Sequence, residues 1–89
     1  MTTNRAGQWM SREEDMEDFG LLLGKSNARL VPDEDVLVNH FTEMTRAIGV
    51  VFFGVEPGEP AMQAFVRGLR RGWGEERRRL HAEPHQASK

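Results

Sequence analysis

The side chains of this sequence that could carry out chemistry are few and are not grouped. Two of its three histidines, His81 and His85, have the i, i+4 spacing of a helical metal pair, but Pro84 lies between them. Because a metal site needs convergent ligands in a fixed geometry, we expect no metal centre there. His40 has Glu43 three residues later, a spacing that predicts a solvated helix contact and not a catalytic dyad.

Other kinds of reaction centre are also missing from the sequence. There is no cysteine among the 89 residues, which excludes disulfides, thiolate metal sites and cysteine nucleophiles. No Ser/His/Asp set, no glycine-rich phosphate loop after a strand and no pair of acids in an apolar cleft can be argued. We therefore expect a protein that is not an enzyme and that holds no cofactor.

The sequence does not predict a secreted or membrane protein. The segment from Met1 to Trp9 lacks the apolar run behind a basic start that marks a signal peptide. The longest apolar stretch, Ile48 to Val55, has eight residues, whereas a bilayer span needs about 20. The lack of cysteine suits a reducing compartment, so a cytoplasmic protein is the expectation.

Charge is distributed unevenly along the chain. Residues 1–60 carry eleven acidic and five basic side chains, whereas residues 61–89 carry three acidic and seven basic ones. A basic helix of this kind can bind nucleic acid, or it can lie beside an acidic helix of its own chain or of a partner. Phosphate binding is driven by summed positive charge, and the net charge here is −2, so nucleic acid is the less favoured partner.

Six arginines account for most of the basic segment: Arg67, Arg70, Arg71, Arg77, Arg78 and Arg79. Arginine is enriched at interfaces because its planar guanidinium offers a fork of donors and stacks on aromatic rings. In one interpretation these arginines form an exposed face that pairs internally with Glu75 and Glu76. In the other they bind a carboxylate-rich partner, with Trp73 as the buried anchor of that recognition surface.

The positions of these residues depend on an all-α, three-helix domain predicted over residues 11–82. Apolar residues in this region recur at steps of three and four, the spacing of one helix face. Residues 1–10 have no such period and should form a flexible N-terminus, and residues 83–89 should form a disordered tail. A chain this short buries little surface, so a dimer, intertwined or side by side, is expected.

The first helix should begin at Ser11, because Ser11 and Glu14 have the spacing of a capping box. Gly24 should end it. Its expected buried stripe is Met16, Phe19 and Leu23. In the connector that follows, Leu30 and Val31 should anchor the loop in the core.

Two longer helices are expected, one over residues 33–53 and one from Pro60 to about residue 82, separated by a Pro/Gly turn. Residues 48–55 are rich in β-branched and aromatic side chains and could form a short strand. The helical spacing continues through them, however, and no second strand is present to pair, so we favour helix. The seams of these helices supply the expected core and dimer surface: Leu37, Phe41, Met44, Ile48, Val51, Met62, Phe65, Val66 and Leu69.

Two features of the long helices suggest an interaction surface. Residues 50–53 are all apolar and face all sides of a helix, so they must be covered all round or form an exposed patch. Gly68, Gly72 and Gly74 each cost about 1 kcal/mol relative to alanine. Either the third helix approaches the second one closely, or it bends near these glycines and turns Trp73 toward a partner.

A resemblance to a known family rests on two segments. The stretch Val50-Val51-Phe52-Phe53-Gly54-Val55 and the stretch from Ala61 to Trp73, within the helical layout, resemble the small bacterial anti-activators that sequester LuxR-type quorum-sensing regulators. The resemblance implies an all-helical homodimer that binds the acyl-homoserine-lactone receptor and blocks its dimerisation and DNA binding. It implies no individual binding residue.

The leading hypothesis is therefore a non-enzymatic inhibitor that binds a transcription regulator through an exposed apolar helix face. The alternative is a small nucleic-acid-binding protein that uses the arginine-rich third helix. The partner-binding residues expected from side-chain type and position are Phe52, Phe53, Val55, Arg67, Arg70, Arg71, Trp73 and Arg77.

Overall fold

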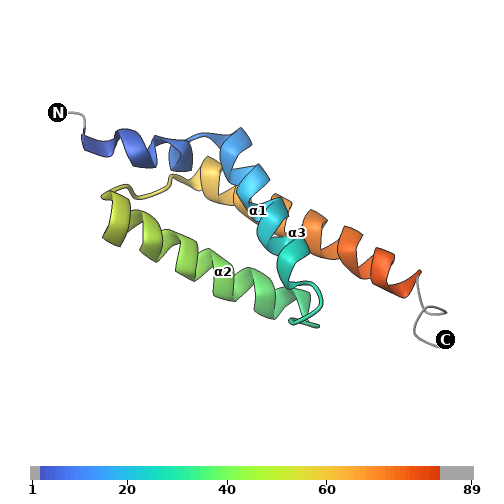
Figure 1. Cartoon of the computed structure of the whole chain (residues 1–89). Helices are drawn as coiled ribbons and strands as arrows, with labels where there is room; N and C mark the ends of the chain where they lie inside the picture. Colours follow the sequence, from blue (N-terminus) through green and yellow to red (C-terminus); the bar gives the residue numbers. More distant parts are fainter. Residues whose placement is uncertain (1–2, 83–89) are drawn as a thin grey trace.

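A computed structural model describes residues 3–82, and this part of the chain is helical with no strand (Figure 1). The elements in order are a 3-10 helix η1 (Thr3–Ser11), α1 (Glu13–Asn27), α2 (Glu34–Ile48), a π-helix η2 (Gly49–Phe53) and α3 (Glu59–His81). The prediction of an all-α fold with three principal helices is confirmed.

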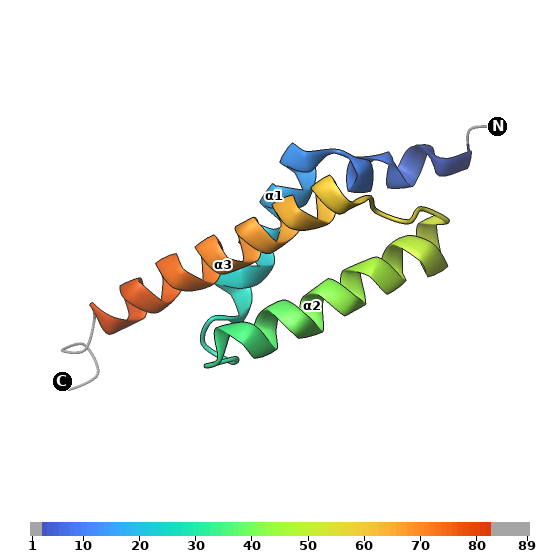
Figure 2. The same cartoon turned by 180° about the vertical axis from the view of Figure 1, so that it is seen from behind.

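The tightest interface joins α1 to α3, which run parallel although α2 separates them in the sequence (Figures 1 and 2). Glycines from both helices make this contact. A Cβ on Gly68 would lie 2.8 Å from the backbone nitrogen of Leu21, and one on Gly72 would lie 3.0 Å from that of Lys25. Residue numbers rise together along both helices, which gives the parallel direction.

Two glycines of α1 complete the contact from the other side. A Cβ on Gly20 would lie 2.9 Å from the backbone nitrogen of Leu69, and one on Gly24 would lie 2.8 Å from that of Trp73. Gly24 was expected to end the first helix. It lies instead within α1 and packs on α3. The close approach expected between the second and third helices occurs instead between α1 and α3, where glycines of each helix face the backbone of the other.

Residues 3–11 form η1, and the end of this helix packs on the core. Met10 is fully buried, and Trp9 packs edge-on against Phe19, with ring centroids 5.2 Å apart. Ser11 ends η1 and does not cap α1, which starts at Glu13. A 3-10 helix eclipses residues three apart, so its contacts leave no 3.6-residue pattern in the sequence. The predicted tail at 83–89 lies outside the described residues.

The second helix matches its predicted range, because α2 and η2 together reach Phe53. Asp33 caps it, since Oδ1 of Asp33 accepts hydrogen bonds from the backbone nitrogens of Asp35 at 2.9 Å and Val36 at 3.3 Å. Gly54 ends it with a φ of 65°, a left-handed conformation that favours glycine. Residues 49–53 are therefore helical and not a strand.

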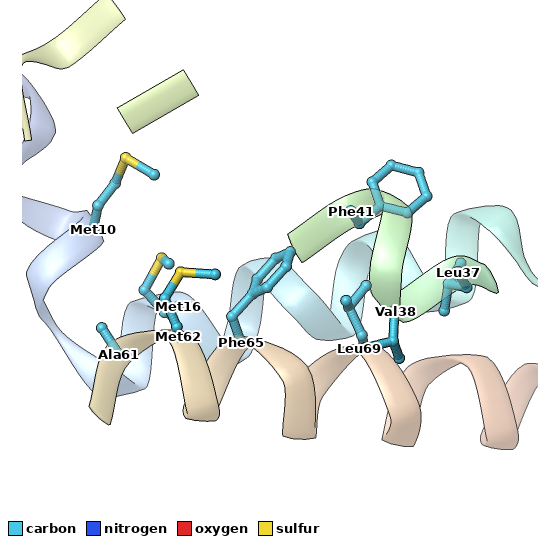
Figure 3. Packing of buried hydrophobic residues seen from close by; sticks show 9 residues of the cluster. All are labelled: Met10, Met16, Leu37, Val38, Phe41, Ala61, Met62, Phe65 and Leu69. Carbon is cyan, nitrogen blue, oxygen red and sulfur yellow. The ribbon is translucent and has the colours of Figure 1, made fainter. Parts of the chain in front are cut away.

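The core lies along α3 between α1 and α2, from Met10 and Met16 near one end to Leu37 near the other (Figure 3). Most of the predicted core residues are in it. Those that are buried are Leu37, Phe41, Met62, Phe65 and Leu69, and those that are half-buried are Met44, Ile48 and Val66.

Two residues expected inside the chain are outside it. Val51 is 72% exposed, so it is not a core residue of a single chain, and its place in a dimer surface stays a prediction. Leu30 is 75% exposed, whereas Val31 is half-buried against the core. In the loop after α1, the fully buried residue is Ala28. It directly follows Asn27, the last residue of α1, and keeps a helical backbone conformation.

Candidate protein-binding surfaces

The π-helix η2 determines which aromatic side chain faces the core at the end of the second helix. A π-helix turns less per residue than an α-helix. By the end of one π turn, a side chain therefore takes the direction that the preceding residue would have in an α-helix. In α-helical spacing Phe52 would follow Phe41, Thr45 and Ile48 on the inner face. In the structure Phe53 takes that place, half-buried against Trp9 with ring centroids 6.2 Å apart.

Phe52 is consequently turned outward. It is 75% exposed, and its neighbours Val50 and Val51 are exposed beside it. We call Val50, Val51 and Phe52 the η2 patch. Among the predicted partner-binding residues, Phe52 lies in this patch, whereas Phe53 and Val55 pack against the core and are less accessible to a partner.

Three of the predicted partner-binding arginines make ion pairs inside the chain. Arg67 and Arg71 of α3 each lie 3.6 Å from a different carboxylate oxygen of Glu17 on α1. Arg70 lies 3.2 Å from Glu34 at the start of α2. The basic helix thus lies beside the acidic helix of its own chain, which was one of the predicted arrangements. Such exposed pairs contribute roughly 0–1 kcal/mol each.

Glu75 and Glu76 of α3 pair with basic residues of the same chain. This agrees with the interpretation in which the arginines form an internally paired face. Glu75 lies 3.3 Å from Nε of Arg71 and 3.7 Å from the Lys25 amino group of α1. Glu76 accepts hydrogen bonds from Nε and Nη2 of Arg79, and the one from Nη2 is 2.6 Å long. These hydrogen bonds are the main reason why the pKa of Glu76 is lowered, and the positive charge of Arg79 adds to the effect.

Trp73 connects α3 to the α1–α2 loop. Its indole Nε1 donates a hydrogen bond of 2.8 Å to the carbonyl oxygen of Val31. Arg77, one turn later, donates from Nη1 to the carbonyl oxygen of Ala28 at 3.1 Å, and its guanidinium lies 5.4 Å from the centre of the Trp73 ring. Trp73 does not swing away at a helix break, because α3 is continuous through Gly72 and Gly74. Both side chains hold the loop in place.

A hollow of about 610 Å³ lies beside Trp73 on the C-terminal part of α3. This part of the helix extends past α2 and the α1–α2 loop (Figures 1 and 2). The lining residues are Trp73, Gly74, Arg77, Arg78, His81 and Ala82. We call this hollow the arm pocket. The spacing of these residues in the sequence does not indicate a pocket, because the exposed end of a helix has no special pattern.

His40 lies edge-on to its neighbour Phe41, with ring centroids 4.9 Å apart, and has no hydrogen-bonded acid among residues 3–82. The same part of the chain contains no group of three or more His, Asp or Glu that could hold a metal ion. None of its helices is both long enough and apolar enough to cross a bilayer.

Comparison of the chain with protein-family models, with curated proteins and with solved structures finds no match.

Proposed function

We propose that this protein is a non-enzymatic protein-binding inhibitor that uses the η2 patch to contact its target. The observation that carries the proposal is the 75% exposure of Phe52, at the end of a helix whose preceding turns are well packed. Large exposed aromatic side chains are costly to leave in water and are typical anchors of protein interfaces. The π-helix presents this ring to solvent while Phe53 keeps the end of the helix attached to the core.

The target that we propose is a LuxR-type quorum-sensing regulator in the cytoplasm, as the resemblance of residues 50–55 and 61–73 implies. In this proposal the inhibitor, as a homodimer, occupies the regulator's own dimerisation surface with an apolar helix end. The regulator is then unable to dimerise on DNA. A monomeric regulator contacts only one half-site of a palindromic operator, so it binds DNA weakly.

Light scattering after size-exclusion chromatography tests the proposal directly. The protein is run alone and then mixed with the ligand-binding domain of a LuxR-type regulator. We expect a dimer alone and a defined hetero-complex in the mixture. Phe52→Glu should abolish the complex while far-UV circular dichroism stays unchanged.

Leu22→Glu is the matched control, because Leu22 is an exposed apolar residue of α1 outside the η2 patch. It should leave the complex intact. The proposal fails if Phe52→Glu binds the regulator as the unchanged protein does, or if both variants lose binding equally. Binding of nucleic acid with a steep salt dependence, and no complex with the regulator, would favour the alternative function of the arginine-rich helix.

A further inference from the structure

Gly74 lies in the interior of α3, and no packing contact among the described residues requires a glycine at this position. Glycine destabilises a helix interior relative to alanine, so a glycine there needs a reason. Gly68 and Gly72 have one, since a Cβ at either position would overlap the backbone of α1. At Gly74 the nearest atom that a Cβ would meet is Nη1 of Arg78 at 3.6 Å, an ordinary van der Waals distance.

The free face of Gly74 forms part of the wall of the arm pocket. Beside it, Trp73 contributes an apolar surface that is held in place by its hydrogen bond to Val31. The lack of a side chain at Gly74 allows another backbone to approach α3 closely, as α1 does at Gly68 and Gly72. The position therefore fits a second helix packed across α3 at this point.

The charges around the arm pocket indicate what kind of helix this is. Four arginines of α3 make ion pairs with carboxylates of the same chain: Arg67, Arg70, Arg71 and Arg79. Arg77 and Arg78, which line the pocket, have no carboxylate partner among residues 3–82. Among the arginines of α3, Arg77 and Arg78 are thus the two without a carboxylate partner within the described residues. Arg77 donates from Nη1 to the carbonyl oxygen of Ala28 and keeps its other N–H donors for a partner. An arginine binds a carboxylate through two parallel N–H···O bonds.

We propose that the arm pocket binds an acidic amphipathic helix of another protein, with its backbone close to Gly74 and its carboxylates on Arg77 and Arg78. A polyphosphate chain fits the site less well, because it has no apolar face to place against Trp73. The inference goes beyond the proposed function and uses a different surface. It stands whether or not the η2 patch binds a LuxR-type regulator.

Titration of the full chain with a synthetic peptide tests the proposal. The probe is a fluorescein-labelled helical peptide of alanine and leucine that carries glutamates one turn apart. A peptide with glutamine in their place and a single-stranded oligonucleotide serve as comparisons. Fluorescence anisotropy gives the affinity. Trp73 emission in a Trp9→Phe background, where Trp73 is the remaining one of the two tryptophans, gives the place of binding.

Gly74→Ala separates binding from folding because it acts on them in opposite directions. Alanine at an open helical position should raise the melting temperature by about 4 °C. The new methyl group should block close approach and weaken peptide binding by about fivefold. An unchanged affinity in this variant would overturn the proposal.

Arg78→Gln provides a second variant, with Arg46→Gln as its matched control. Arg46 is an exposed arginine of α2 that lies outside the arm pocket. Arg78→Gln should weaken binding of the acidic peptide by about tenfold, whereas Arg46→Gln should change it by less than about twofold. Equal losses in the two variants, no response of Trp73, or tighter binding of the oligonucleotide than of the acidic peptide would each contradict the assignment.

Discussion

Gly68 of α3 lies so close to the carbonyl oxygen of Glu17 in α1 that no side chain fits between the two helices. Gly20, Gly24 and Gly72 repeat this contact, so the α1–α3 interface is formed by backbone against backbone. Glycines in the interior of a helix weaken that helix when it is isolated. Because α1 and α3 both contain such glycines, each depends on the other for its stability.

Gly68→Ala should therefore destabilise the fold, because either the backbone of α1 or that of α3 must move to admit the methyl group. The expected loss is about 2–3 kcal/mol in the free energy of unfolding, measured by urea denaturation. Gly58→Ala is the control, since a Cβ there would lie 3.8 Å from its nearest neighbour, Cδ of Pro60. A loss equal to that of the control would show that the helices tolerate a wider spacing.

The π-helix makes a prediction about two adjacent phenylalanines. Phe53→Ala should lower the free energy of unfolding by about 2 kcal/mol, less than a fully buried phenylalanine, because Phe53 is half-buried against Trp9. Phe52→Ala should change it by less than about 0.5 kcal/mol, because Phe52 is largely in solvent. The reverse order would mean that residues 49–53 form an ordinary α-helical turn.

Met10 should be a core residue in solution despite its place in the N-terminal segment. It is fully buried in contact with the main cluster, so Met10→Ala should cost about 2–4 kcal/mol in urea denaturation. Its exposed neighbour Gln8 provides the comparison, and Gln8→Ala should have little effect. If both variants unfold at the urea concentration of the parent, η1 is not packed against the core.

The hydrogen bond from Trp73 to Val31 should contribute to stability as well as to the shape of the arm pocket. Trp73→Phe keeps most of the apolar surface but leaves the carbonyl oxygen of Val31 without its donor, so we expect a loss of about 1 kcal/mol. Amide hydrogen exchange should rise in residues 28–31. Trp9→Phe should leave exchange in this loop unchanged, because Trp9 lies on η1 against Phe19 and Phe53.

Glu76 should titrate below its ordinary pKa of 4.5, because Arg79 hydrogen-bonds its charged form. With the folded pKa lowered, the contribution of the pair to stability is present above the unfolded pKa and is lost as the pH falls through the folded pKa. Titration of the side-chain carboxyl carbon by NMR measures this pKa. Arg79→Gln should raise it toward 4.5, and a pKa that does not respond to this change would exclude Arg79 as the main cause.

The sequence was sufficient to predict the helices that follow a 3.6-residue period. The seam from Leu37 to Ile48 and the seam from Met62 to Leu69 point inward, as their spacing requires. Helix ends were less predictable, since Gly24 is a typical stop signal that here serves as a packing residue. A glycine satisfies either need, and only the presence of α3 decides between them.

The candidate surfaces were only partly predictable, for two physical reasons. The seam predicted Val51 as the inward residue after Ile48, whereas the π turn turns Phe53 inward, and the sequence pattern carries no sign of this shift. The partner of Trp73 is a backbone carbonyl 42 residues earlier, and every residue type has such a carbonyl. Which arginines are left without a carboxylate likewise depends on how α1 and α2 lie on α3.

The parallel pairing of α1 with α3 has a consequence for how the chain acquires its structure. Residues 17–25 contact residues 65–73, so the tightest interface joins the two α-helices that are farthest apart in the described sequence. Contacts of high sequence separation require a long loop to close before they stabilise anything, and they slow folding. During synthesis α1 therefore emerges before its binding surface exists, and the helix pair can assemble only after α3 has been made.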